Sequence, residues 1–152
     1  MADPLPRLDI EIRLLKREDT TYPVEITLGG EQVFQGVLTS AITSITTDGR
    51  CLFDTLFADA TLRNAWAEAR GRSTRRRVRL RIDPAAAELH TLPWEQLTDG
   101  NVALAAHDDT PFSRYLPIGL PWGRPITTRP VRALIVISNP ADLYSKYALP
   151  QA

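Results

Sequence analysis

Three segments of this 152-residue chain alternate apolar and polar side chains with a period of two, and no other feature restricts the fold as strongly. They span residues 8–14, 24–28 and 77–82, and arginine takes every second place in the third. Because successive side chains of a strand point to opposite faces, this period is typical of strands that are buried on one face. We therefore predict three half-buried strands.

A tight turn is predicted after the second of these segments. Gly29 and Gly30 stand there, and glycine adopts the positive φ angles of hairpin turns without strain. The two glycines lack the spacing of a phosphate-binding loop. Residues 33–38 are then expected to form the returning strand, so that residues 1–46 make a small antiparallel β unit.

The hydrophobic period becomes helical after Ser44. Apolar residues recur at one-turn spacing from Leu52 to Ala69, which predicts one broken helix or two short helices over residues 47–70. Gly71 stands where a left-handed C-terminal cap would end the second helix. The candidate N-terminal caps are Thr47, Asp48, Asp59 and Thr61.

Shorter elements are expected between the third alternating segment and residue 116. Pro93 breaks any long helix around it, so residues 94–97 are predicted to form a single turn. Residues 102–106 and 112–116 are predicted to be short strands on either side of a turn. Residues 47–116 would thus hold helices and further strands.

The last third of the chain divides into two parts. Residues 117–130 contain four prolines and two glycines, which predicts a linker without regular structure. Residues 131–152 begin with a nearly unbroken apolar run at 131–137, which is typical of a strand buried on both faces.

Charge and cysteine content restrict the possible partners and compartment. Lys and Arg number 18, as do Asp and Glu, so the net charge gives no bias towards nucleic acid or an anionic membrane. Cys51 is the single cysteine, which rules out an intrachain disulfide. The chain shows neither a signal-peptide pattern nor an apolar run long enough to cross a bilayer. We expect a cytoplasmic protein.

Three segments, in this order, resemble the CHAT family of bacterial caspase-like cysteine peptidases. The first is the basic and apolar segment 77–84, followed by Leu-Pro-Trp-Glu-Gln-Leu at 92–97. The second is Thr-Pro-Phe-Ser-Arg-Tyr-Leu at 110–116, and the third is the apolar run and its Ser-Asn-Pro end at 131–140. The helical segment 52–57 also fits the region upstream of these motifs.

The resemblance implies an α+β region that leads into the first strand of a caspase-like α/β sandwich. In that family a His–Cys dyad lies on later strands, so the resemblance carries no catalytic residue onto this chain. It implies a non-catalytic N-terminal portion of a cysteine peptidase, completed by a following or separate catalytic segment. The alternative is a free-standing protein-interaction module derived from the CHAT domain. The expected partner of this chain is the catalytic segment or another protein chain, and the strand at 131–137 could also pair in a homodimer.

Two groups of residues could form a catalytic site, the first with peptidase chemistry and the second with glycosidase chemistry. Cys51 with His90 or His107 supplies the residue types that a cysteine peptidase uses as nucleophile and general base. Cys51, however, adjoins an apolar helix face. We favour a buried or half-buried structural thiol and loop histidines, and we expect no metal site. Trp94 and Glu95 pair an aromatic ring with a carboxylate, and here we favour a core anchor beside a surface acid.

Arginines are densest between residues 70 and 81. Guanidinium groups match phosphate oxygens, which would suit nucleic acid, but the segment lacks aromatic residues on which bases could stack. We therefore interpret this basic cluster as a solvated strand face and loop, without nucleic acid as a partner and without a cofactor. The basic cluster consists of Arg70, Arg72, Arg75, Arg76, Arg77, Arg79 and Arg81.

Overall fold

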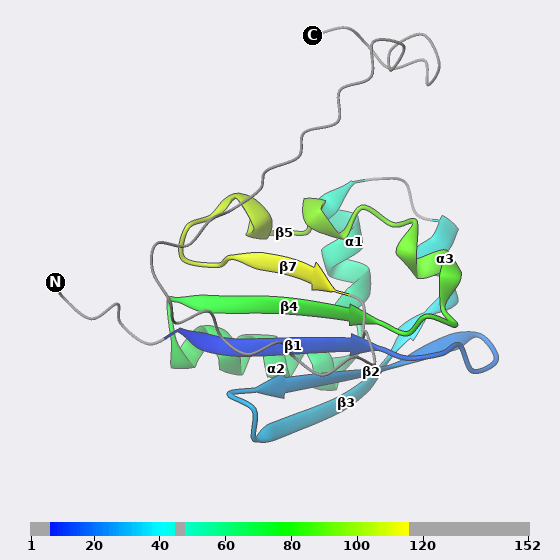
Figure 1. Cartoon of the computed structure of the whole chain (residues 1–152), viewed down its shortest axis with the longest axis horizontal. Helices are drawn as coiled ribbons and strands as arrows, with labels where there is room; N and C mark the ends of the chain where they lie inside the picture. The colour runs from blue at the N-terminus through cyan, green and yellow to red at the C-terminus, as the bar shows by residue number, and fades with distance from the viewer. Residues whose placement is uncertain (1–6, 45–47, 116–152) are drawn as a thin grey trace, which may run out of the picture. The chain divides into compact units, whose positions relative to one another are not determined.

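The computed structural model describes residues 7–44 and 48–115, which form a mixed sheet with helices on one face (Figure 1). The strands of the main sheet are β1 (Leu8–Leu14), β2 (Thr21–Leu28), β3 (Gln32–Thr39), β4 (Arg76–Ile82) and β7 (Phe112–Tyr115). The longer helices are α1 (Gly49–Leu56) and α2 (Ala60–Arg72). The shorter elements are α3 (Ala87–His90), the 3₁₀ turns η1 (Ser40–Ser44), η2 (Trp94–Gln96) and η3 (Leu104–Ala106), and the strands β5 (Thr98–Asp99) and β6 (Val102–Ala103).

Strand β1 lies at the centre of the main sheet, whose order is β3-β2-β1-β4-β7. It pairs antiparallel with β2 on one side and parallel with β4 on the other. β7 continues the sheet parallel to β4. The antiparallel unit of the first forty residues and the later strands therefore share one sheet, and α1 and α2 form the crossover between β3 and β4.

The predicted hairpin is confirmed. β2 and β3 pair antiparallel over eight residue pairs, and Gly29 and Gly30 have φ angles of 62° and 81° in the turn that follows β2. These angles lie in the left-handed region, which glycine adopts without the steric cost that a Cβ brings.

The helical segment consists of two helices, one of the two alternatives predicted. Asp48 caps α1 by accepting a hydrogen bond from Arg50 N at 3.1 Å, and Asp59 caps α2 through Thr61 N at 2.8 Å. The expected cap at Gly71 is wrong. α2 continues to Arg72 and ends because Ser73 is extended, with φ −155° and ψ 140°, so no left-handed residue is needed.

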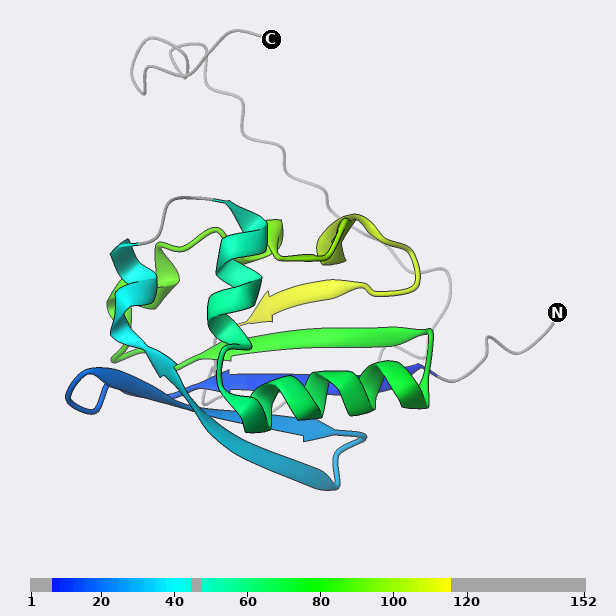
Figure 2. The same cartoon turned by 180° about the vertical axis from the view of Figure 1, so that it is seen from behind.

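The core lies between one face of the sheet and helices α1 and α2 (Figure 2). Every second residue of β1, β2 and β4 is buried there, as the alternating pattern predicts. Phe53, Phe57 and Trp66 form an aromatic cluster on the helices, with ring centroids 4.5–5.6 Å apart. Trp66 is 4% exposed and is therefore a core residue.

Residues 102–106 are a strand only in part. Val102 and Ala103 form β6, which pairs with β5, and Leu104 begins the 3₁₀ turn η3. Leu104 is buried, and its N–H still donates to Leu97 O at 2.9 Å at the point where the backbone turns into η3. The second predicted strand is β7, which pairs with β4 and not with residues 102–106.

Over the described residues the fold is of the α+β class, with five strands in the main mixed sheet and helices α1 and α2 over one face. None of the helices in residues 7–44 and 48–115 has the length and apolar character needed to cross a membrane. The predicted linker at 117–130 and the predicted strand at 131–137 lie outside the described residues.

Candidate functional site

Figure 1 shows the face of the main sheet opposite α1 and α2, called the outer face below. The strand register places side chains of both charges on this face. Within the described part of the chain, no helix covers it. Parallel pairing places Asp9 beside Arg77, Glu11 beside Arg79 and Arg13 beside Arg81. The outer face consists mainly of Asp9, Glu11, Arg13, Glu25, Arg77, Arg79, Arg81, Ser113 and Tyr115.

Arg77 and Asp9 form the best-defined ion pair of the outer face. The guanidinium donates two hydrogen bonds, at 2.6 and 3.0 Å, to the two carboxylate oxygens. These bonds lower the pKa of Asp9 and raise the pKa of Arg77. Because both side chains are largely in solvent, the pair contributes little to stability, and that little is lost as the pH falls through the lowered Asp9 pKa.

Tyr115 at the β7 edge bonds to Glu11 across the intervening strand β4. Its hydroxyl donates to Glu11 Oε1 at 2.8 Å, and the guanidinium of Arg79 lies 3.9 Å from the other oxygen. Burial raises the pKa of the Tyr115 phenol, and the hydrogen bond to Glu11 adds to the shift. Glu11 therefore ties β1 to β4 and β7 on the outer face.

Two members of the basic cluster gather around Trp66 instead. The guanidinium of Arg76 lies 5.9 Å from the centroid of the Trp66 ring, and Arg70 lies 3.5 Å from Asp99. The same Asp99 accepts a hydrogen bond from Trp66 Nε1 at 3.0 Å. Burial, followed by the charge of Arg70, lowers the pKa of Arg76. These two arginines thus cover a core residue.

The remaining members of the basic cluster have acidic partners, with one exception. Arg75 lies 3.3 Å from Asp109, and Arg72 pairs with Glu68 one helical turn away. Arg81 makes no ion pair or hydrogen bond within the described residues. Most arginines of the basic cluster thus pair with acidic side chains of this chain. This favours the interpretation of the cluster as a solvated face and not as a phosphate-binding surface. The absence of a nucleic-acid partner stays a prediction.

The Leu-Pro-Trp-Glu-Gln-Leu motif builds a corner of the core. Trp94 has no exposed surface, and its Nε1 donates to Leu89 O at 2.7 Å. Trp94 is thus a core anchor, as predicted. Glu95 is on the surface and lies 3.1 Å from the guanidinium of Arg114 on β7. Arg114 also donates to His90 O at 3.0 Å and so joins this motif to the edge strand.

Cys51 is exposed on the first turn of α1, and the expectation of a buried or half-buried thiol is wrong. The apolar face of α1 includes the next two residues, Leu52 and Phe53, and rotation along the helix turns Cys51 away from it. Partial desolvation raises the pKa of the thiol, and a hydrogen bond to Asp48 and the charges of Asp48 and Asp54 raise it further. This environment disfavours the thiolate.

Each of the two histidines contacts a backbone atom of its own loop. His90 Nε2 lies 3.2 Å from Asp83 O, and His107 Nδ1 accepts a hydrogen bond from Asp109 N at 3.2 Å. No hydrogen bond joins either ring to Cys51 within the described residues. In the same ranges, 7–44 and 48–115, no group of three His, Cys, Asp or Glu side chains is arranged to hold a metal ion.

The fold and these sites define an α+β domain with a charged outer face and an exposed, unactivated thiol. Comparison with protein-family models, with curated proteins and with solved structures found no match.

Proposed function

We propose that this chain is a non-catalytic N-terminal portion of a CHAT-family, caspase-like cysteine peptidase, completed by a following or separate catalytic segment. One observation carries the non-catalytic part of the proposal: within the described residues, neither His90 nor His107 bonds to Cys51, so the thiol lacks the base that a cysteine peptidase needs. The pKa of the Cys51 thiol is raised even though a position near a helix N-terminus usually lowers it.

The packing of the family-like motifs supports the remaining part of the proposal. The basic strand is β4, the Leu-Pro-Trp-Glu-Gln-Leu motif surrounds η2, and the second motif supplies β7. β7 pairs with β4, and Arg114 of β7 bonds to Glu95 and to two backbone carbonyls near the motif. Segments that resemble consecutive family motifs are thus in direct contact, as parts of one inherited unit would be.

We expect Cys51 to be alkylated more slowly at neutral pH than a reference peptide thiol. Because Asp48 and Asp54 disfavour the thiolate, the midpoint of the rate-against-pH profile with iodoacetamide should lie above that of the peptide. Asp48→Asn should lower the midpoint, since asparagine keeps the helix cap but removes the charge. A midpoint below that of the peptide would show an activated thiol and contradict the proposal.

The alternative function, a free-standing protein-interaction module, is favoured by a different observation. The described residues, 7–44 and 48–115, all belong to one compact unit. The hydrophobic core of this unit forms one cluster of buried residues that runs from Ile10 to Leu104. A core of this kind would allow the unit to fold and act without a catalytic partner.

A further inference from the structure

Arg13 and Arg81 form a row of two like charges on the outer face. They are partners in the parallel register of β1 and β4, at the carboxyl ends of both strands. The preceding two rows each pair an arginine with an acid, Arg77 with Asp9 and Arg79 with Glu11. Like charges on neighbouring strands repel, so an anion bound beside this row would relieve the repulsion.

The two guanidinium groups differ in how far they are neutralised. Arg13 Nη1 lies 2.7 Å from Glu25 Oε2, whereas its buried Nε atom has no hydrogen-bond partner within the described residues. Arg81 has no acidic partner in those residues. On its far side stands Tyr115, whose hydroxyl is already committed to Glu11. Among the described residues, the row thus offers one guanidinium without an acidic partner, that of Arg81.

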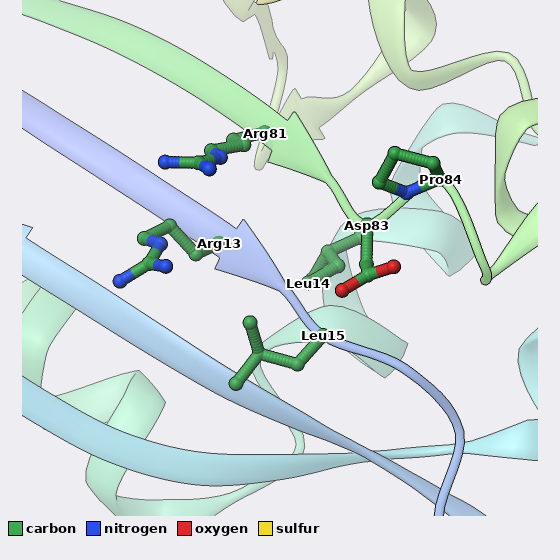
Figure 3. A pocket seen from close by; sticks show the side chains of 6 residues that line it. All are labelled: Arg13, Leu14, Leu15, Arg81, Asp83 and Pro84. Atoms are coloured by element: carbon green, nitrogen blue, oxygen red, sulfur yellow. The ribbon is translucent and has the colours of Figure 1, made fainter. Parts of the chain in front are cut away.

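A hollow of about 60 Å³ lies beside this row (Figure 3). Its walls are Arg13, Leu14, Leu15, Arg81, Asp83 and Pro84. Figure 3 shows both guanidinium groups on one side of the hollow and the Asp83 carboxylate on the other. One oxygen of that carboxylate accepts a hydrogen bond from Ala85 N at 2.8 Å.

We propose that the Arg13–Arg81 row and this hollow form a binding site for a carboxylate presented by a polypeptide. A guanidinium fork matches the two oxygens of a carboxylate, and Leu15 and Pro84 provide apolar walls for the carbons that carry it. The nearby charges of Glu25 and Asp83 favour a singly charged anion over a phosphate with two charges. The carboxyl ends of parallel strands are also where α/β sheets commonly bind ligands. The site does not depend on the family resemblance.

The test measures binding of small carboxylates to the full chain by NMR at low salt. The probes are N-acetylglutamate N-methylamide for a side-chain carboxylate, N-acetylalanine for a terminal one, and inorganic phosphate. The neutral comparison is N-acetylglutamine N-methylamide. We expect saturable shifts of the Leu15 and Ala85 amide signals with at least one carboxylate, and none with the glutamine compound. The carboxylate that binds more tightly identifies the source.

Arg81→Gln should weaken this binding about tenfold or more, because it removes the free charge-assisted donor. Its melting temperature should equal or exceed that of the wild type, since the repulsion with Arg13 is relieved. Arg77→Gln is the matched control: it removes the same charge from the same strand and face, and should change affinity by about twofold or less. Equal effects of the two variants, tighter binding of phosphate than of both carboxylates, or no saturable shift would overturn the proposal.

Discussion

Trp94→Ala is expected to lose roughly 3–5 kcal/mol of the free energy of unfolding, enough to unfold a domain at the low end of the usual range of stability. The side chain is completely buried and is among the largest of the fully buried ones. Its removal leaves a cavity between η2 and α3, and Leu89 O loses the donor that lies 2.7 Å away. Denaturant unfolding followed by circular dichroism measures the loss.

Glu95→Ala is the control for that substitution. Glu95 is the next residue, but its carboxylate is half exposed and pairs only with Arg114 on the surface. Such a pair contributes about 0–1 kcal/mol, so the variant should unfold close to the wild type. If Trp94→Ala kept the stability of Glu95→Ala, the motif would not be the core anchor described above.

Gly49→Ala is expected to destabilise the protein by about 3 kcal/mol or more, although alanine normally stabilises a helix relative to glycine. A Cβ at residue 49 would lie 1.7 Å from Gln96 O and 2.7 Å from Gln96 C. Both are backbone atoms, which cannot rotate away, so α1 would have to move from the motif that contains Trp94. Thermal unfolding of the variant measures the effect.

Gly71→Ala provides the matched control in α2. A Cβ there would meet no atom within 4 Å, so only the helix propensity changes. The variant should be more stable by about 0.5–1 kcal/mol. A neutral or stabilising Gly49→Ala would mean that α1 does not contact the Gln96 backbone as closely as the structure has it.

The strands and helices could be predicted because their signals are local. The alternation in residues 8–14 and 77–82 gives the buried faces of β1 and β4, and the glycines give the hairpin. Trp94 could be assigned to the core because a large aromatic side chain buries much apolar surface and is more often a core residue than part of a catalytic site. The aspartates that cap α1 and α2 were among the candidates for the same reason: capping depends on neighbouring residues alone.

The pairing of distant strands could not be predicted. The local sequence of residues 8–14 and 77–82 does not indicate that β1 and β4 are neighbours. Nor does it indicate that their register places Arg13 beside Arg81. The candidate carboxylate site was missed for that reason. Cys51 was misjudged because a residue next to an apolar helix face can lie on either side of it, and one residue moves the side chain by about 100°. Gly71 failed as a cap because an extended Ser73 ends the helix equally well.

Hydrogen exchange at residues 131–137, combined with light scattering on the same samples, tests most directly the proposal that a catalytic segment completes this chain. An apolar strand of a parallel sheet needs neighbours on its edges and cover on both faces, and in the CHAT family these come from the catalytic segment. We expect these amides to exchange freely in a monomer and to gain protection only as a dimer forms. A strict monomer in which they are protected to the limit of global unfolding would contradict the proposal and favour the free-standing module.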